Sequence, residues 1–313
     1  MTSAIKIENL TKYYGKFKAL SSLNLEVDTN TIYAFIGPNG AGKTTTIRTL
    51  LGMLNPTEGT VSVLGQHPTQ KNTGMFNKIG YLPGELSMYD KLTGNELLKF
   101  FGNLKNITDW KYVNELVERL NCEPTKKIKT LSKGNKQKFG LVLAFMHKPE
   151  LLILDEPTSG LDPFLQQTTI ELVQESKNTG ATVFLSSHIF SEIDKVAETV
   201  GFIKEGELIV EEELEVLKSN AVKTIEIEFK DAPPATLFDS MGNVQKVESE
   251  NNSIKLNVTG SLDSVIKEIS NYEVLNIISE EPSLEDLFMN CLLYTSDAAD
   301  EGLGVDLGGR RII

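Results

Sequence analysis

The segment "GPNGAGKTT", Gly37–Thr45, decides the fold of this 313-residue chain. It follows the continuously apolar stretch "IYAFIG" at residues 32–37, which predicts a strand buried on both faces, and it opens a helical pattern. Glycines in such a loop let successive backbone N–H groups approach phosphate oxygens, and the start of the helix adds partial positive charge. In this context the segment indicates a phosphate-binding loop rather than an ordinary glycine-rich turn.

Two side chains of this loop have specific chemistry. Lys43 is placed to reach the β and γ phosphates of a nucleoside triphosphate, and the hydroxyl of Thr44 can serve as a ligand of Mg²⁺. We expect the rest of the loop to contribute mainly backbone contacts. These further nucleotide-binding residues are Gly37, Asn39, Gly40, Ala41, Gly42 and Thr45.

A second apolar strand, "LLILDEP" at residues 151–157, ends in two carboxylates. A parallel sheet presents such residues at the carboxyl edge of its strands, where ligands bind. Asp155 can therefore hold magnesium through water, and Glu156 is placed to act as the general base that polarises an attacking water. Both could instead be turn residues before Pro157, but the loop at Gly37 favours the catalytic interpretation.

His188, in "LSSH", follows the next predicted strand, "TVFLSS" at residues 182–187. A single histidine at such a position is more often a structural residue. Only its predicted neighbours, two strands that end in phosphate-binding and metal-binding groups, make it a candidate contact for the γ-phosphate.

Composition and charge exclude several classes of protein. The net charge is −12, and nucleic-acid and membrane-surface binders need a basic face, so neither class is expected. Cys122 and Cys291 are too few and too far apart for a disulfide framework or a zinc site. The first residues lack a signal-peptide core, and no apolar run reaches the ~18 residues of a membrane helix, so we expect a cytoplasmic chain.

The order of patterns predicts an α/β fold in three parts. Strands at 4–10, 23–27, 32–37, 60–65, 78–83, 151–155 and 182–187, with helices between the later ones, belong to a nucleotide-binding domain at residues 1–219. Residues of about 85–148, including the amphipathic "NELLKFF" and "YVNELVERL", read as an inserted helical subdomain. The whole is expected to be a phosphate-loop NTPase cassette with a mostly parallel sheet.

The C-terminal part reads differently. Residues 220–290 follow the order strand, helix "PATLFDSM", two strands, helix "SLDSVIKEIS", strand, which is typical of a small α+β domain of the ferredoxin-like kind. The final segment, residues 291–313, continues no earlier pattern, and its ending "VDLGGRRII" resembles a translated sequencing adapter. We interpret it as a non-native tail and exclude it from the fold.

Together these motifs resemble the nucleotide-binding subunit of ATP-binding cassette (ABC) transporters over roughly residues 4–215. "GPNGAGKTT" resembles the Walker A loop and "LLILDEP" the Walker B strand. "SGLD", ending at Asp162, resembles the D-loop, and His188 the switch histidine. Tyr14 in "KYYG" resembles the aromatic residue that stacks on adenine, although a core tyrosine is an equal alternative. The resemblance implies Mg²⁺-dependent hydrolysis of ATP.

A further segment, "LSKGN" at residues 131–135, resembles the family's "LSGGQ" signature. In that family two subunits enclose two ATP molecules head to tail, so Ser132 and Gly134 are implied to contact the γ-phosphate bound by a second subunit. Lys133 and Asn135 depart from the usual signature. In "YLPGE" the family's magnesium-contacting glutamine is replaced by Gly84, and whether Glu85 substitutes for it stays open.

The resemblance implies a particular working arrangement. The chain would be peripheral to the cytoplasmic membrane, joined to a separate membrane-spanning permease. Its motif sequences are most similar to those of bacterial exporters of drugs, peptides or bacteriocins. One alternative is a soluble ABC-type ATPase not coupled to transport, but the second cassette, coiled coil or zinc ligands usual in such proteins are missing. A degenerate regulatory cassette is disfavoured because Glu156 and His188 are both present.

Overall fold

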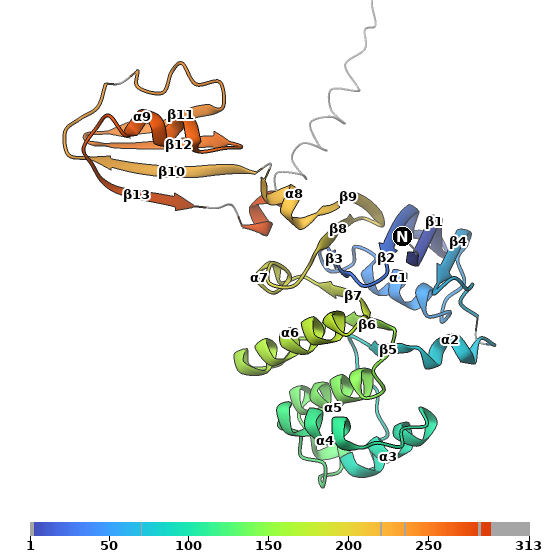
Figure 1. Ribbon diagram of the computed structural model, residues 1–313. Helices are drawn as coiled ribbons and strands as arrows, with labels where there is room; N and C mark the ends of the chain where they lie inside the picture. Colours follow the sequence, from blue (N-terminus) through green and yellow to red (C-terminus); the bar gives the residue numbers. More distant parts are fainter. Residues whose placement is uncertain (1–2, 70, 220, 235, 281–282, 289–313) are drawn as a thin grey trace, which may run out of the picture. The chain divides into compact units, whose positions relative to one another are not determined.

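The structure of the chain is a computed structural model with two compact units, Met1–Glu212 and Glu213–Ile313 (Figure 1). The residues that it describes are 3–69, 71–219, 221–234, 236–280 and 283–288. The segment 291–313, interpreted above as a non-native tail, lies outside the described residues. Helix α8, Leu214–Ser219, which the sequence analysis included in the first domain, belongs to the second unit.

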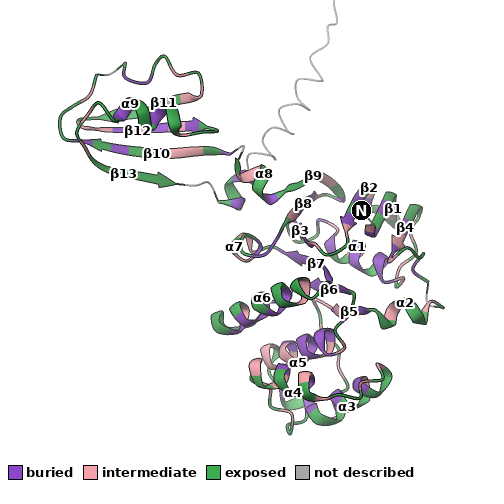
Figure 2. Cartoon of the chain, viewed as in Figure 1, coloured by how far each residue is buried: buried purple, intermediate pink, exposed green. Residues whose placement is uncertain are grey.

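The first unit contains a six-stranded sheet in the order β5-β6-β7-β3-β8-β9, in which neighbours from β5 to β8 run parallel. Three strands are buried at every residue, as expected for the middle of a parallel sheet (Figure 2). These strands, β6, β7 and β3, are adjacent, so their carboxyl ends lie side by side. The strand bounds are β3 Ile32–Ile36, β5 Ile79–Leu82, β6 Leu151–Asp155, β7 Thr182–Ser187, β8 Thr199–Lys204 and β9 Glu207–Glu213.

A second, antiparallel sheet has the order β2-β1-β4. Its inward side chains join those of the parallel sheet in one apolar core, which includes Ile7, Leu23, Phe35 and Ile153. The predicted strands are confirmed, and the second is longer than its pattern indicated because it begins at the hairpin turn. The bounds are β1 Ser3–Tyr14, β2 Phe17–Asp28 and β4 Glu58–Val63.

Helices complete the first unit, and the predicted helical subdomain is confirmed. Helix α3 begins with a capping box in which the side chain of Thr93 accepts from Glu96 N and the Glu96 carboxylate accepts from Thr93 N. None of the described helices is long and apolar enough to cross a membrane. The bounds are α1 Lys43–Leu50, α2 Thr73–Asn77, α3 Gly94–Leu104, α4 Lys111–Arg119, α5 Lys133–Phe145, α6 Pro163–Asn178 and α7 Phe190–Ile193, with a 3₁₀ turn at Ile128–Thr130.

The second unit is an antiparallel sheet in the order β11-β12-β10-β13 with its own apolar core. The first predicted helix, residues 234–241, is wrong. Its hydrogen bonds join Leu237 N to Pro234 O and Met241 N to Phe238 O, three residues apart, so this segment forms successive turns. Phe238 still packs into the core. The bounds are β10 Val222–Phe229, β11 Val244–Glu250, β12 Ser253–Thr259, α9 Asp263–Ile269 and β13 Val274–Glu280.

Candidate active site

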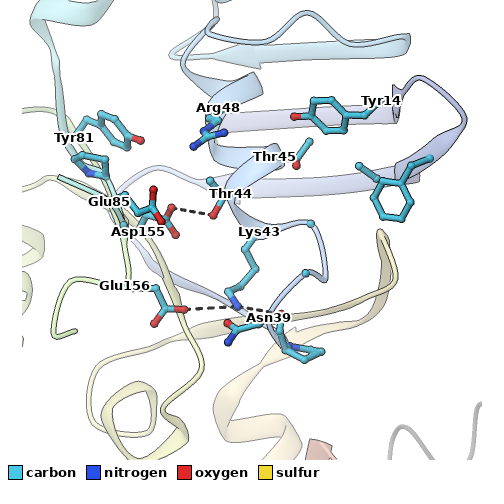
Figure 3. A pocket seen from close by; sticks show the side chains of 17 residues that line it. Tyr14, Asn39, Lys43, Thr44, Thr45, Arg48, Tyr81, Glu85, Asp155 and Glu156 are labelled. Carbon is cyan, nitrogen blue, oxygen red and sulfur yellow. Dashed lines mark hydrogen bonds and ion pairs between the residues drawn. The ribbon is translucent and has the colours of Figure 1, made fainter. Parts of the chain in front are cut away.

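A cavity of about 530 Å³ opens at the carboxyl edge of the parallel sheet (Figure 3). Many of the residues selected from the sequence line it. These are Tyr14, Asn39, Gly40, Gly42, Lys43, Thr44, Thr45, Asp155 and Glu156. The other selected residues lie outside its lining, and they are Gly37, Ala41, Ser132, Gly134, Asp162 and His188.

The loop after β3 brings a buried cation into this cavity. Gly42 caps helix α1 with φ 117°, and a Cβ there would lie 2.7 Å from Leu20 Cδ2, so only glycine fits. Lys43 is 6% exposed, and its Nζ donates to Gly37 O at 2.5 Å. The same Nζ lies 3.6 Å from Glu156 Oε1. A lysine held by carbonyl oxygens at the start of a helix is suited to bind an anion.

Thr44 and Asp155 place two oxygen ligands together. Thr44 Oγ1 donates to Asp155 Oδ2 at 3.1 Å, and Ser186 Oγ donates to Asp155 Oδ1 at 2.5 Å. A hydroxyl and a carboxylate fit Mg²⁺, which prefers hard oxygen ligands and usually keeps phosphate and water ligands as well. The described residues contain no cluster of three or more His, Cys, Asp or Glu side chains that could hold a metal ion.

Tyr81 borders the same part of the cavity. Burial and the negative charge of Asp155 raise the pKa of Tyr81 to about 12. Its phenol is therefore protonated, and uncharged, at neutral pH. Arg48 also lines the cavity and adds a second cation to it.

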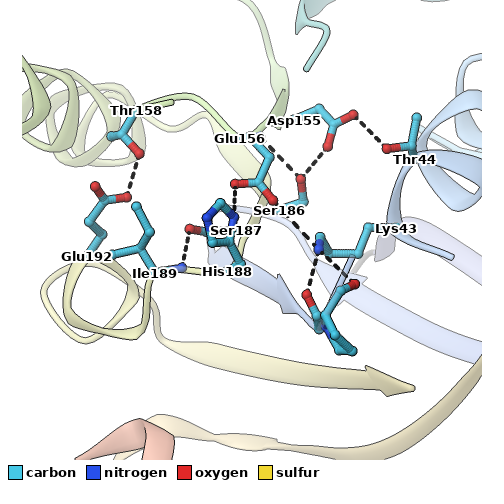
Figure 4. Close-up of polar contacts among 12 residues, drawn as sticks. Lys43, Thr44, Asp155, Glu156, Thr158, Ser186, Ser187, His188, Ile189 and Glu192 are labelled. Carbon is cyan, nitrogen blue, oxygen red and sulfur yellow. Dashed lines mark hydrogen bonds and ion pairs between the residues drawn. The ribbon is translucent and has the colours of Figure 1, made fainter. Parts of the chain in front are cut away.

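Glu156 and His188 meet at the ends of adjacent strands β6 and β7 (Figure 4). The His188 ring reaches across, so that its Nδ1 lies 2.7 Å from Glu156 Oε2. Glu156 has φ 52°, a left-handed conformation that is costly for a residue other than glycine. The carboxylate is thus held between His188 on one side and Lys43 on the other, at the wall of the cavity.

An aromatic pair lies at the mouth of the cavity. Tyr14 and Phe17 are cross-strand partners at the β1–β2 turn, both line the cavity, and they are 44% and 65% exposed. Exposed aromatic rings beside a phosphate-binding loop offer an apolar surface for a flat base. The sequence analysis missed Phe17, although the two-residue turn Gly15-Lys16 could have indicated that it would pair with Tyr14.

The segment that resembles the signature and the segment that resembles the D-loop both lead into helices. Ser132 caps α5, and its Oγ accepts a hydrogen bond from Asn135 N at 3.2 Å. Asp162 caps α6 in the same way, accepting from Leu165 N at 3.0 Å. Gly134 lies against the loop before α6, because a Cβ there would be 2.6 Å from Gly160 O. None of these three capping and signature residues lines the cavity of its own chain.

Two protein-family models match parts of the chain. The family model described as "ABC transporter" matches residues 20–159. A second model, described as "AAA domain, putative AbiEii toxin, Type IV TA system", matches residues 127–194, which include the LSKGN segment, both carboxylates and His188.

Known relatives cover between about two thirds and nine tenths of the chain. A bacitracin transport ATP-binding protein of Bacillus licheniformis is 36% identical, over 93% of this chain and 98% of the relative. A lantibiotic transport ATP-binding protein of Streptococcus pyogenes is 35% identical, over 67% of this chain and 90% of the relative. A solved structure of the ATP-binding subunit of an ABC transporter is 27% identical with a TM-score of 0.65, over 69% of this chain and 92% of that one.

Proposed function

Because the chain belongs to the ABC transporter family as its ATP-binding and ATP-hydrolysing subunit, we propose that this hydrolysis drives a separate membrane permease that exports a drug, a peptide or a bacteriocin. The proposal is supported by relatives named for bacitracin transport and lantibiotic transport. It is also consistent with the described helices, none of which could itself form a path through a membrane.

The observation that carries the mechanism is the position of Glu156, with Lys43 Nζ at 3.6 Å and His188 Nδ1 at 2.7 Å. In our proposal the backbone of the Gly37–Thr45 loop and Lys43 hold the β and γ phosphates of ATP. Thr44 and Asp155 would hold Mg²⁺, which supplies charge neutralisation on the phosphate oxygens when bound. Glu156 then accepts the proton of the attacking water, and His188 orients its carboxylate and contacts the γ-phosphate.

Ser132 and Gly134 complete this site from a second copy of the chain. They belong to a helix start suited to an anion, yet they lie outside the lining of their own cavity. We therefore infer a head-to-tail pair in which each copy supplies Ser132, Gly134 and the Asp162 loop to the ATP bound by the other.

The substitution Glu156→Gln tests the mechanism because it removes the base but keeps the shape. We expect Mg²⁺-dependent hydrolysis to slow by at least ~10²-fold, while ATP binding persists. Glu150→Gln is the matched control, since Glu150 lies before the opposite end of β6 and pairs with Lys78 at the surface. A Glu156→Gln protein that hydrolyses ATP at the parental rate would contradict the role of Glu156.

The transport proposal has its own test. Cells that express the chain with a permease encoded beside it should accumulate less of an exported peptide than cells that carry Glu156→Gln. Equal accumulation with both versions, while the purified parental protein hydrolyses ATP, would reject coupling to export and favour a soluble ATPase.

A further inference from the structure

A buried side chain of helix α5 contacts the loop that carries Glu156. Gln137 is 2% exposed, and its Nε2 donates to Glu156 O at 3.3 Å and to Pro157 O at 3.1 Å. A buried amide group that lost these partners would be costly, so the two bonds tie the helix firmly to the loop. The mechanism above gives Gln137 no role.

Glu156 needs such support because its backbone is in an unfavourable conformation. A left-handed φ of 52° in a non-glycine residue is unfavourable and persists only where the surroundings fix it. The N–H of Glu156 donates to Ser186 O at 3.1 Å, which fixes one side of the residue. The next residue, Pro157, has no N–H with which to hold the loop. The two carbonyl contacts with Gln137 therefore help to fix the backbone from which the Glu156 carboxylate projects.

The same helix contacts the loop at a second point. Gly134 lies three residues before Gln137, on the same face of α5, and the space for its missing Cβ is occupied by Gly160 O. Helix α5 therefore meets the 156–160 loop at both Gln137 and Gly134. A movement of the start of α5 cannot leave the loop in place without breaking one of these contacts.

Another element holds the far side of the loop. Thr158 Oγ1 donates to Glu192 Oε2 at 2.5 Å, which links the loop to α7, just after His188 (Figure 4). Burial and the nearby charge of Glu156 raise the pKa of Glu192. The loop is thus held by contacts from β7, α7 and α5. Among these three elements, α5 is the one capped by the signature residue Ser132.

We propose that Gln137 is a positioning residue that couples the start of helix α5 to the general base of the same chain. The inference rests on the proposed function, in which Ser132 and Gly134 bind the ATP held by a second copy. When that ATP is bound, α5 is fixed by its start, Gln137 fixes the Glu156 backbone, and the base is set for the ATP of its own site. Hydrolysis at one site then depends on nucleotide at the other.

The substitution Gln137→Met tests this, because it keeps the length of the side chain but removes the donor. We expect kcat to fall by about tenfold to a hundredfold, as small displacements of catalytic groups do, with the affinity for ATP changed by less than about twofold. The matched control is Thr169→Val. Thr169 is 1% exposed, but its hydroxyl donates only to Leu165 O inside α6, so this variant should keep the parental kcat.

Two readouts separate positioning from general destabilisation. Combined with Glu156→Gln, Gln137→Met should cause less than a further twofold loss of rate, whereas damage to the fold would act in both backgrounds. The parental rate should also rise with ATP concentration with a Hill coefficient above 1, which falls to about 1 in Gln137→Met.

Each outcome has a distinct meaning. Three results would overturn the coupling role while leaving the mechanism intact. Gln137→Met could lower kcat by the same factor in the parental and Glu156→Gln backgrounds, it could keep the parental kcat, or it could leave the Hill coefficient unchanged. An unaltered rate in Glu156→Gln alone would instead reject the proposed function on which the coupling rests.

Discussion

Helices α1 and α5 both begin at a site suited to an anion, but only α1 begins at a complete one. At the start of α1, Lys43 and Thr44 line the cavity beside Asp155 and Glu156. At the start of α5, Ser132 and Gly134 line none of it, although Ser132 caps the helix as well as any residue type can. A capped helix start can therefore form a complete anion site within one chain, or half of a site between two chains.

Gly42 and Gly134, the glycines at the two helix starts, are required for different structural reasons. Gly42 is required by its φ of 117° and by the side chain of Leu20, both of which shape a loop that wraps its own ligand. Gly134 has ordinary helical backbone and is required because α5 lies directly on Gly160. Gly42 thus shapes the loop around the ligand, whereas Gly134 allows helix α5 to lie close to the catalytic loop.

The largest expected effect is that of Lys43→Ala, which removes the cation of the complete site. We expect the dissociation constant for ATP to rise by at least ~100-fold, equivalent to about 2.7 kcal/mol, because a charge-assisted contact to phosphate is lost. Ser132→Arg should leave ATP binding by the single chain within about twofold, since Ser132 is remote from that cavity. Titration of both proteins with a fluorescent ATP analogue measures this, and equal losses would contradict the distinction between the two helix starts.

Lowering the pH should reduce the free energy of unfolding through His147, which lies just after α5. His147 follows the end of α5, and burial with the nearby charge of Lys105 lowers the pKa of His147 to about 4, from a usual value of 6.5. Below pH 6.5 the unfolded chain takes up a proton that the folded chain does not, so stability falls as the pH drops toward 4. Between pH 7 and pH 5 we expect a loss of about 1 kcal/mol, below the ~1.8 kcal/mol of full linkage because the ring is partly exposed.

The single tryptophan makes this loss measurable. The Trp110 ring packs on α3, where it fills the space beside Gly102, so its fluorescence follows the helical subdomain during unfolding by urea. His147→Gln should show a weaker dependence on pH than the parental protein. Identical pH dependence in His147→Gln and in the parental protein would show that another group is responsible.

The smallest expected effect is that of truncation after Asn290. None of the site residues of α1 and α5 belongs to the final segment, whose sequence lacks the periodicity of a helix or strand. The melting temperature and the ATPase rate should therefore stay the same. A loss of several degrees would show that this segment packs on the described part of the chain.

Features encoded by neighbouring residues were predictable from the sequence. The loop at Gly37, the strand that ends at Asp155 and the cap at Ser132 each lie within about ten residues, where periodicity and residue type are informative. The segment 234–241 has apolar residues at helical spacing too. However, Pro233 before it, Pro234 at its first position, and Asp239, Ser240 and Gly242 within or after it favour turns.

Features that depend on distant residues could not be predicted in this way. Ser186 reaches Asp155, and Gln137 reaches Glu156, only because β7 and α5 pack against the end of β6. In the sequence Ser186 is one polar residue at the end of a strand, and Gln137 is one of several polar residues at the start of a helix. Their importance follows from the packing of the sheet, which no local pattern reveals.

The central claim is that the start of α5 serves a second copy of the chain, and mixing two inactive variants tests it most directly. Lys43→Ala disables the start of α1, and Ser132→Arg disables the start of α5. In a head-to-tail mixed dimer both defects fall in one composite site, and the other site joins an intact Lys43 loop to an intact Ser132. Differential tags isolate the mixed dimers, and trapped radiolabelled ATP is counted for each dimer.

The account predicts about one trapped ATP for each mixed dimer and almost none in either unmixed variant. Trapping is the chosen readout because hydrolysis needs both sites if the two are coupled. If the start of α5 acted on the nucleotide of its own chain, every site in the mixture would carry a defect. Equal trapping in mixed and unmixed samples would therefore contradict the claim that Ser132 and Gly134 bind the nucleotide of a partner.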